Sequence, residues 1–227
     1  MVFPIFTNGT LLDDAYCALL DANRHLIPVL SVEGNETETD ERRGAGVFAS
    51  IRSAMSKLTE RQILFGVSIT VTKENLSTVL DKAFVEDLRA KGCGALFYVE
   101  YVPTEKGTEY LSLDGDDLTL LQTRTIALRQ QISDMVMLSF PGDEEAMGGC
   151  LASGRGFFHI NPKGGAEPCP FSPHAKHNLA QSSILQVLSS GYFDALRSLS
   201  ASAGPHTGGC VLFQKENEVR ALLGHPV

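Results

Sequence analysis

The sequence predicts an α/β protein, with a partial parallel (β/α) barrel in residues 1–140 and a small cysteine-containing α+β domain in residues 141–227. Strand and helix patterns alternate three times with similar spacing, which is typical of parallel βαβ units on one sheet. One strand is apolar on one face and polar on the other, whereas a parallel strand covered on both sides is usually apolar throughout. After residue 140, three cysteines lie in loops rich in glycine and proline, which favours a metal or cluster site over core packing.

The composition argues against several classes of function. The chain of 227 residues has a net charge of −8, and no basic cluster is larger than Arg42-Arg43, which argues against binding of nucleic acid. No apolar run approaches the roughly 20 residues that span a bilayer, and the N-terminus lacks the pattern of a signal peptide. We therefore expect a cytoplasmic protein without a membrane partner. In that compartment, five cysteines favour metal ligation or free thiols over disulfides.

Four strand patterns lie in the first half of the chain, at residues 3–6, 26–33, 64–72 and 95–101. Amphipathic helix patterns follow the first three strands, at residues 11–24, 46–58 and 76–91. We expect the first strand to be buried and residues 34–43 to form a polar loop. We also expect Asn75 to cap the third helix.

The third strand has two different faces. Val67 and Ile69 point to one side, whereas Ser68 and Thr70 point to the other. A row of small polar side chains favours a lumen that holds a ligand. The neighbouring strands also carry polar pairs, namely Ser31 with Glu33 and Tyr98 with Glu100. In βα barrels the chemistry lies at the carboxyl ends of the strands, so we expect a binding site at that edge.

Further elements are predicted beyond the fourth strand. They are a loop at residues 104–117, a helix at 118–132, a strand at 135–140, short helices at 178–188 and 192–199, and a loop at 201–209. Between Cys150 and Cys169, a short run of strand formers that ends at Ile160 is followed by a turn at residues 161–165. This pattern predicts a β-hairpin.

Three cysteines are candidate metal ligands. A hairpin folds its ends together, so Cys150 and Cys169 can meet in space although 18 residues separate them, and Cys210 follows in a Gly-Gly-Cys segment. Glycines let the backbone approach such a site and donate amide hydrogen bonds to sulfur. An iron–sulfur cluster and a zinc ion both fit this pattern; the candidate fourth zinc ligands are His159, His174, His177 and His206. Cys17 and Cys93 are interpreted as packing residues.

Thirteen residues separate Cys150 from Gly164, and four separate Gly164 from Cys169. With Pro168 and Pro170 flanking the second cysteine, this pattern resembles the radical SAM enzymes that carry a SPASM or twitch extension. The upstream strands resemble the third to sixth strands of the partial barrel in the same family. The segments that carry this second resemblance are Thr7-Asn8-Gly9, Ser31-Val32-Glu33-Gly34, Arg43-Gly44, Val67 to Thr72 and Tyr98 to Pro103.

The resemblance implies part of an enzyme whose family reductively cleaves S-adenosylmethionine (SAM) to a 5′-deoxyadenosyl radical. The SAM contacts that it implies are Ser31, Glu33, Ser68, Thr70 and Tyr98. The ligands that it implies for an auxiliary [4Fe-4S] cluster are Cys150, Cys169 and Cys210; the fourth ligand is not evident from the sequence. Arg43 is a candidate partner for a carboxylate. A peptide or a protein is the expected class of substrate.

The sequence also departs from this family. It contains no CxxxCxxC loop, which binds the cluster that cleaves SAM, and no Gly-Gly-Glu segment. We therefore expect a fragment, whether engineered, truncated or one half of a split protein. Such a chain would be inactive alone, and it would either be poorly soluble or depend on a partner that supplies the missing N-terminal strands. The alternative is a non-catalytic binding module that zinc or a cluster stabilises.

Overall fold

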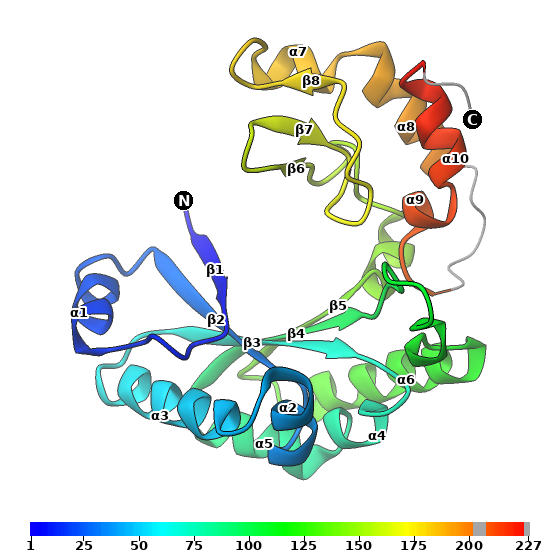
Figure 1. Cartoon of the computed structure of the whole chain (residues 1–227). Coiled ribbons are helices and arrows are strands. Elements are labelled where there is room, and N and C mark those ends of the chain that lie inside the picture. The colour runs from blue at the N-terminus through cyan, green and yellow to red at the C-terminus, as the bar shows by residue number, and fades with distance from the viewer. Residues whose placement is uncertain (202–207, 225–227) are drawn as a thin grey trace. The chain divides into compact units, whose positions relative to one another are not determined.

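The computed structural model describes residues 1–201 and 208–224. The chain forms two compact units (Figure 1). The first comprises Met1–Tyr101 and Gly107–Phe140, and the second comprises Val102–Lys106 and Pro141–Val227. Each unit has its own apolar core.

Within the described residues, the first unit is built on a five-stranded sheet in which every strand is parallel to its neighbours. The strands are β1 (Phe3–Thr7), β2 (Leu26–Val32), β3 (Phe65–Val71), β4 (Cys93–Glu100) and β5 (Val136–Phe140). Their order in the sheet is their order in the chain. The structure therefore confirms the predicted α/β fold with its parallel sheet.

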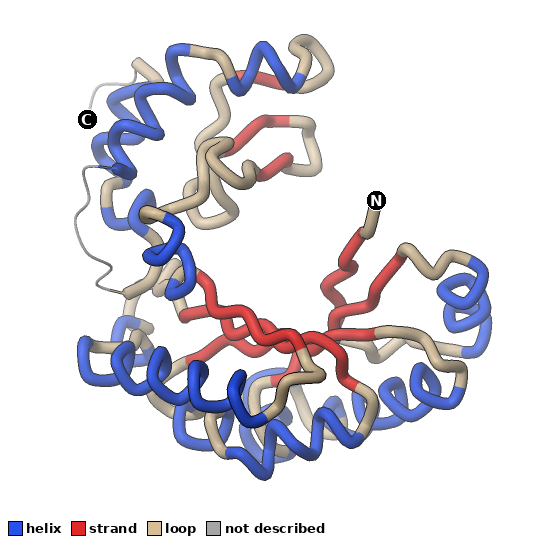
Figure 2. Tube along the Cα trace, turned by 180° about the vertical axis from the view of Figure 1, so that it is seen from behind, coloured by secondary structure: helices blue, strands red, loops and turns tan. Residues whose placement is uncertain are grey.

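Helices cover one face of this sheet, as Figures 1 and 2 show from opposite sides. The helices of the first unit are α1 (Asp14–Ala22), α2 (Glu36–Arg43), α3 (Val47–Glu60), α4 (Leu76–Val79), α5 (Lys82–Ala90), the short η1 (Glu109–Leu111) and α6 (Gly115–Gln131). Val67 and Ile69 of β3 are fully buried among the apolar residues of these helices. In the part of the chain that the structure describes, no helix has both the length and the apolar character needed to cross a bilayer.

Two local predictions in the first unit are wrong. The predicted loop at residues 34–43 contains α2, because Asn35 and Glu38 form a capping box that satisfies the first amides of the helix. The predicted helix at 76–91 is broken into α4 and α5. Asp81 causes the break, since its side chain accepts hydrogen bonds from the amides of Ala83 and Phe84 and so starts a new helix.

The first strand is not buried as predicted. β1 lies at the edge of the sheet and, within the described residues, pairs with β2 alone. Phe3 is 48% exposed and Phe6 is 57% exposed. The Phe6 ring lies edge-on to Phe97 of β4, with 5.7 Å between the ring centroids.

The described part of the second unit contains a small antiparallel sheet and short helices. The strands are β6 (His159–Ile160), β7 (Gly165–Glu167) and β8 (His177–Asn178), and the helices are η2 (Gly142–Met147), α7 (Ile184–Leu188), α8 (Gly191–Ala201), α9 (Val211–Gln214) and α10 (Glu216–Leu222). β6 and β7 form the predicted hairpin. The helix predicted to begin at Asn178 begins only at Ile184, after the capping residue Ser183. Residues 202–207 of the predicted loop at 201–209 lie outside the described residues.

Candidate functional site

Small hydroxyl side chains line the face of the sheet that the helices leave open. Ser31 of β2 is the register partner of Ser68 of β3, so their side chains lie side by side. Thr70 follows on the same face, and all three residues are partly exposed, whereas Val67 and Ile69 are fully buried on the opposite face. The predicted division of the third strand into a polar and an apolar face is confirmed.

The Tyr98 side chain does not lie on the open face with Ser31, Ser68 and Thr70. Its register partner in β3 is Ile69, on the face that the helices cover, and its side chain is fully buried there. The Tyr98 hydroxyl donates a hydrogen bond to the carbonyl oxygen of Val79 at 2.7 Å, and burial raises its pKa. The predicted grouping of Tyr98 with Ser68 is therefore wrong, because the side chain of β4 that lies next to Ser68 is Phe97.

The side chain of Glu33, the first residue after β2, forms ion pairs with two arginines of α2. Its side chain is 2% exposed and lies between two guanidinium groups. Arg42 Nη1 donates to one carboxylate oxygen at 2.9 Å, and Arg43 Nε donates to the other at 2.8 Å. Burial raises the pKa of the Glu33 carboxyl, and the two arginines oppose that rise. Arg43 thus reaches a carboxylate, and this carboxylate belongs to the chain itself.

Asn75 links the carboxyl ends of β2 and β3. Its Nδ2 donates to the carbonyl oxygen of Glu33 at 2.7 Å and to that of Thr70 at 2.9 Å. Its Oδ1 accepts from the amide of Thr72 at 2.8 Å. Asn75 occupies the N-cap position of α4, but its side chain makes no hydrogen bond to that helix. The predicted capping role is therefore wrong.

The three cysteines of the second unit gather in one apolar cluster. Cys169 and Cys210 are buried with their sulfur atoms 3.9 Å apart, and the partly buried Cys150 packs against the same cluster. Tyr192, Phe193 and other apolar side chains complete this cluster. In the described residues, no three or more His, Cys, Asp or Glu side chains are arranged to hold a metal ion. The three thiols therefore lie close together, but they are not arranged as a complete set of metal ligands.

Burial favours the neutral form of each of the three thiols, and backbone amides that donate to the sulfur atoms oppose this effect. The donors are Ala152 to Cys150, Phe171 to Cys169, and Leu212 and Phe213 to Cys210. Burial nevertheless raises the pKa of Cys150 to about 11. The Cys169 thiol, hydrogen-bonded to Cys210, lowers the pKa of Cys210 to about 7, whereas the pKa of Cys169 itself is raised.

This set of donors fits a sulfur-ligated metal centre. Soft thiolates bind zinc and iron–sulfur clusters, and amide hydrogen bonds to sulfur are typical of such sites. By contrast, Cys17 and Cys93 lie buried in the core of the first unit, which agrees with the packing role expected for them.

The described histidines have partners other than the cysteines. His159 Nδ1 lies 2.8 Å from a carboxylate oxygen of Glu167, and His174 Nε2 lies 3.5 Å from one of Glu216. His177 has a ring contact with Tyr192. His206 lies outside the described residues.

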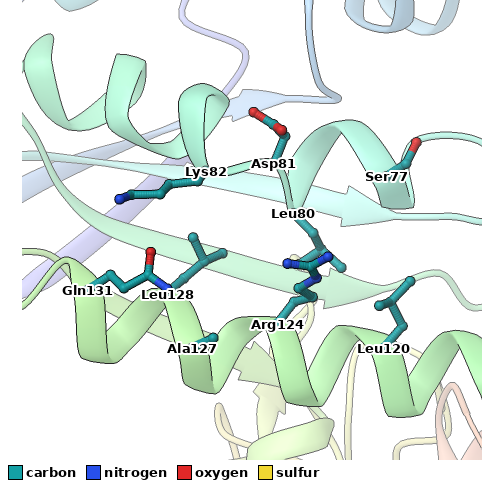
Figure 3. A pocket seen from close by; sticks show the side chains of 9 residues that line it. All are labelled: Ser77, Leu80, Asp81, Lys82, Leu120, Arg124, Ala127, Leu128 and Gln131. Atoms are coloured by element: carbon teal, nitrogen blue, oxygen red, sulfur yellow. The ribbon is translucent and has the colours of Figure 1, made fainter.

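A cavity of 330 Å³ opens on the helical side of the first unit (Figure 3). Arg124 and Leu128 of α6 face Leu80 and Asp81, which lie between α4 and α5. Leu80 and Leu128 also belong to the core under the helices. This cavity is therefore separate from the open face that carries Ser31, Ser68 and Thr70, and sequence reasoning did not single it out.

The five-stranded parallel sheet with its helices has the fold of the partial barrel of radical SAM enzymes. Among solved structures, the chain is similar to anSMEcpe, an anaerobic sulfatase-maturating radical SAM enzyme, with bound AdoMet and Cp18Cys peptide. The TM-score is 0.69 at 18% identity, over 88% of this chain and 61% of that chain. It is also similar to SuiB of Streptococcus suis bound to S-adenosylmethionine, with a TM-score of 0.68 at 17% identity, over 86% of this chain and 50% of that chain.

SuiB bound to the precursor peptide SuiA gives a TM-score of 0.65 at 17% identity, over 86% of this chain and 49% of that chain. The chain thus spans about half to three fifths of the length of these structures. No family model matches the sequence. No curated protein matches it either. The similarity to solved structures therefore establishes the fold.

Proposed function

We propose that this chain is the SAM-binding and auxiliary-cluster part of a cytoplasmic radical SAM enzyme that modifies a peptide or a protein. The observation that carries the proposal is the gathering of Cys150, Cys169 and Cys210 in one apolar cluster. It is supported by a fold whose solved examples include structures with bound AdoMet and with bound peptides.

In this proposal, the open face of the sheet binds SAM. The hydroxyls of Ser31, Ser68 and Thr70 are uncharged donors and acceptors that suit the ribose and the adenine base. Glu33 and Asn75 fix the strand ends that carry them, through the arginine pair and the backbone bonds described above. When bound, SAM would supply the radical chemistry.

In the second unit, Cys150, Cys169 and Cys210 are the proposed ligands of one auxiliary [4Fe-4S] cluster. The amides that donate to their sulfur atoms would stabilise the thiolate form that ligation needs. The apolar surroundings would keep water from the cluster and, together with those hydrogen bonds, set its reduction potential.

Metal analysis of cysteine variants tests the cluster. The chain is purified without oxygen and reconstituted with iron and sulfide, and iron and acid-labile sulfide are measured per chain. Replacing Cys150, Cys169 or Cys210 by Ala should abolish iron binding. Cys17→Ala and Cys93→Ala serve as controls, because they remove buried thiols from the other unit. Full iron content in folded Cys169→Ala protein would overturn the assignment.

Binding of radiolabelled SAM in equilibrium dialysis tests the open face. Thr70→Val keeps the shape of the side chain but removes one hydrogen bond, which is worth about 1 kcal/mol or roughly fivefold in affinity. Thr119→Val is the control, because the Thr119 hydroxyl is exposed and bonds within its own helix. Equal SAM affinities for the two variants would remove Thr70 from the site.

The second candidate is a non-catalytic binding module that zinc stabilises. The distance of 3.9 Å between the sulfur atoms of Cys169 and Cys210 favours it. Two thiolates on one edge of a zinc tetrahedron lie about 3.8 Å apart, given a Zn–S bond of about 2.3 Å. The same metal analysis separates the two functions, since this module would hold zinc without acid-labile sulfide.

A further inference from the structure

Two serine hydroxyls are buried beside the cysteine cluster without a hydrogen-bond partner. Ser153 is fully buried and Ser172 is 2% exposed, and neither hydroxyl is bonded within the residues that the structure describes. Each serine stands three positions after a cysteine, Ser153 after Cys150 and Ser172 after Cys169. The two loops that present candidate ligands therefore each present one unsatisfied hydroxyl.

The backbone fixes both serines next to the cysteine loops. Cys169 and Ser172 are partners in an isolated antiparallel bridge, and the Ser172 amide donates to the Cys169 carbonyl oxygen at 3.0 Å. Residues paired in this way have their Cβ atoms about 4.5–5.5 Å apart, which is within reach of a hydroxyl-to-sulfur hydrogen bond. The Ser153 amide donates to the carbonyl oxygen of Pro168, the neighbour of Cys169, at 3.1 Å.

An unsatisfied buried hydroxyl is costly, because it has lost its hydrogen bonds to water without gaining others. Buried polar groups in native proteins almost always have a protein, water or ligand partner. Ser200 of the same unit follows this rule, because its buried hydroxyl donates to the carbonyl oxygen of Leu196 at 2.9 Å. Among the described residues, Ser112 and Thr125 of the first unit are further exceptions, but the two in the cysteine loops stand next to candidate metal ligands, where a group that accepts hydrogen bonds would satisfy both.

We propose that Ser153 and Ser172 donate hydrogen bonds to the sulfur atoms of the metal centre held by Cys150, Cys169 and Cys210. This inference rests on the proposed function of those cysteines. A hydroxyl that donates to sulfur withdraws negative charge from it. The two serines therefore make the centre easier to reduce and weaken electron donation from sulfur to the metal.

The test measures the metal centre itself in Ser153→Ala, Ser172→Ala and the double variant. Ser200→Ala is the matched control, because it removes a buried hydroxyl that already has a partner in its own helix. The first readout is the midpoint potential of the reconstituted iron–sulfur protein, followed by electron paramagnetic resonance. The second is the sulfur-to-metal absorption band after titration of the apoprotein with Co²⁺ alone.

We expect each serine variant to lower the midpoint potential and to move the Co²⁺ band to longer wavelength, with the largest shift in the double variant. Ser200→Ala should match the unaltered protein, and Ser172→Thr, which keeps a hydroxyl, should lie closer to it than Ser172→Ala. Metal binding with unshifted potential and unshifted band in both serine variants would overturn the inference and leave the cysteine assignment intact. An unaltered chain that binds neither Co²⁺ nor a cluster would overturn both.

Discussion

At the scale of single residues, Asn75 is the side chain that joins two strand ends of the open face. It satisfies the carbonyl oxygens of Glu33 and Thr70 and the amide of Thr72 from a position that is 4% exposed. We expect Asn75→Ala to lower the free energy of unfolding by about 2–4 kcal/mol, because it leaves buried backbone groups unsatisfied. Urea denaturation measures this loss.

The control for Asn75 is Asn35→Ala, which removes an exposed helix cap. That change should cost only about 1 kcal/mol. A loss at Asn75 no larger than the loss at Asn35 would show that water replaces its hydrogen bonds.

Glu33 gives a pH dependence whose direction follows from its environment. Its pKa is raised by burial, so the folded chain holds the proton more tightly than the unfolded chain does. The contribution of this group to stability is then complete below the ordinary glutamate pKa of about 4.3 and is lost as the pH rises through the raised pKa. Glu33→Gln cannot ionise and lacks this loss.

The measurement is the free energy of unfolding of both proteins by urea between pH 4 and pH 7. The stability of the unaltered chain relative to Glu33→Gln should fall as the pH rises. Glu60→Gln, on the exposed surface of α3, is the matched control for the substitution itself. A relative stability that increases with pH would mean that Arg42 and Arg43 outweigh burial.

Alternation along β3 was enough to predict which residues share the open face, since Ser68 and Thr70 are separated by one apolar residue. The same reasoning failed for Tyr98, because a tyrosine suits a polar lumen and a buried contact with Val79 equally well. Nothing in the sequence indicated that the hydroxyls of Ser153 and Ser172 would be buried beside the cysteines. Serine is common in loops, and only the burial of these two sets them apart.

At the scale of elements, most strands were predictable and several helix boundaries were not. Strands of a covered sheet are marked by apolar runs, whereas α2 has no apolar face and forms through its capping box, acidic first turn and basic last turn. Asn35 and Glu38 carried that signal in the sequence. The break between α4 and α5 was hidden for a similar reason, because Asp81 caps a helix inside a continuous amphipathic pattern.

If the cysteine site holds the metal proposed above, the hairpin of β6 and β7 should depend on that metal. Its sheet contacts are short, with two register pairs between β6 and β7, so ligation by the flanking cysteines would supply much of its local stability. Removal of the metal by a chelator should make residues 148–183 sensitive to limited proteolysis while the first unit stays resistant.

Mass spectrometry of the fragments locates the cleavage sites. Cys169→Ala should show the same cleavage without a chelator. Equal resistance of the metal-bound and metal-free proteins would show that the hairpin is stable by itself.

At the scale of the whole molecule, we predict that this chain alone does not cleave SAM. In the radical SAM enzymes that this sequence resembles, three closely spaced cysteines hold the SAM-cleaving cluster, whereas the nearest pair here, Cys150 and Cys169, lies 19 positions apart. Anaerobic incubation with SAM and dithionite should yield no 5′-deoxyadenosine above the protein-free background, as measured by chromatography. anSMEcpe assayed in parallel would validate the conditions, and turnover by this chain would place a catalytic cluster on its own cysteines.

The order of strands in the five-stranded sheet affects how the sheet can fold during synthesis of the chain. Because β1 to β5 lie in the sheet in the order in which they are translated, each new strand finds its partner already synthesised. Among the described strands, the sequence separations that must close are therefore those of single strand–helix–strand units, the shortest that parallel pairing allows. From β1 to β5 the nascent sheet can therefore extend strand by strand while synthesis continues.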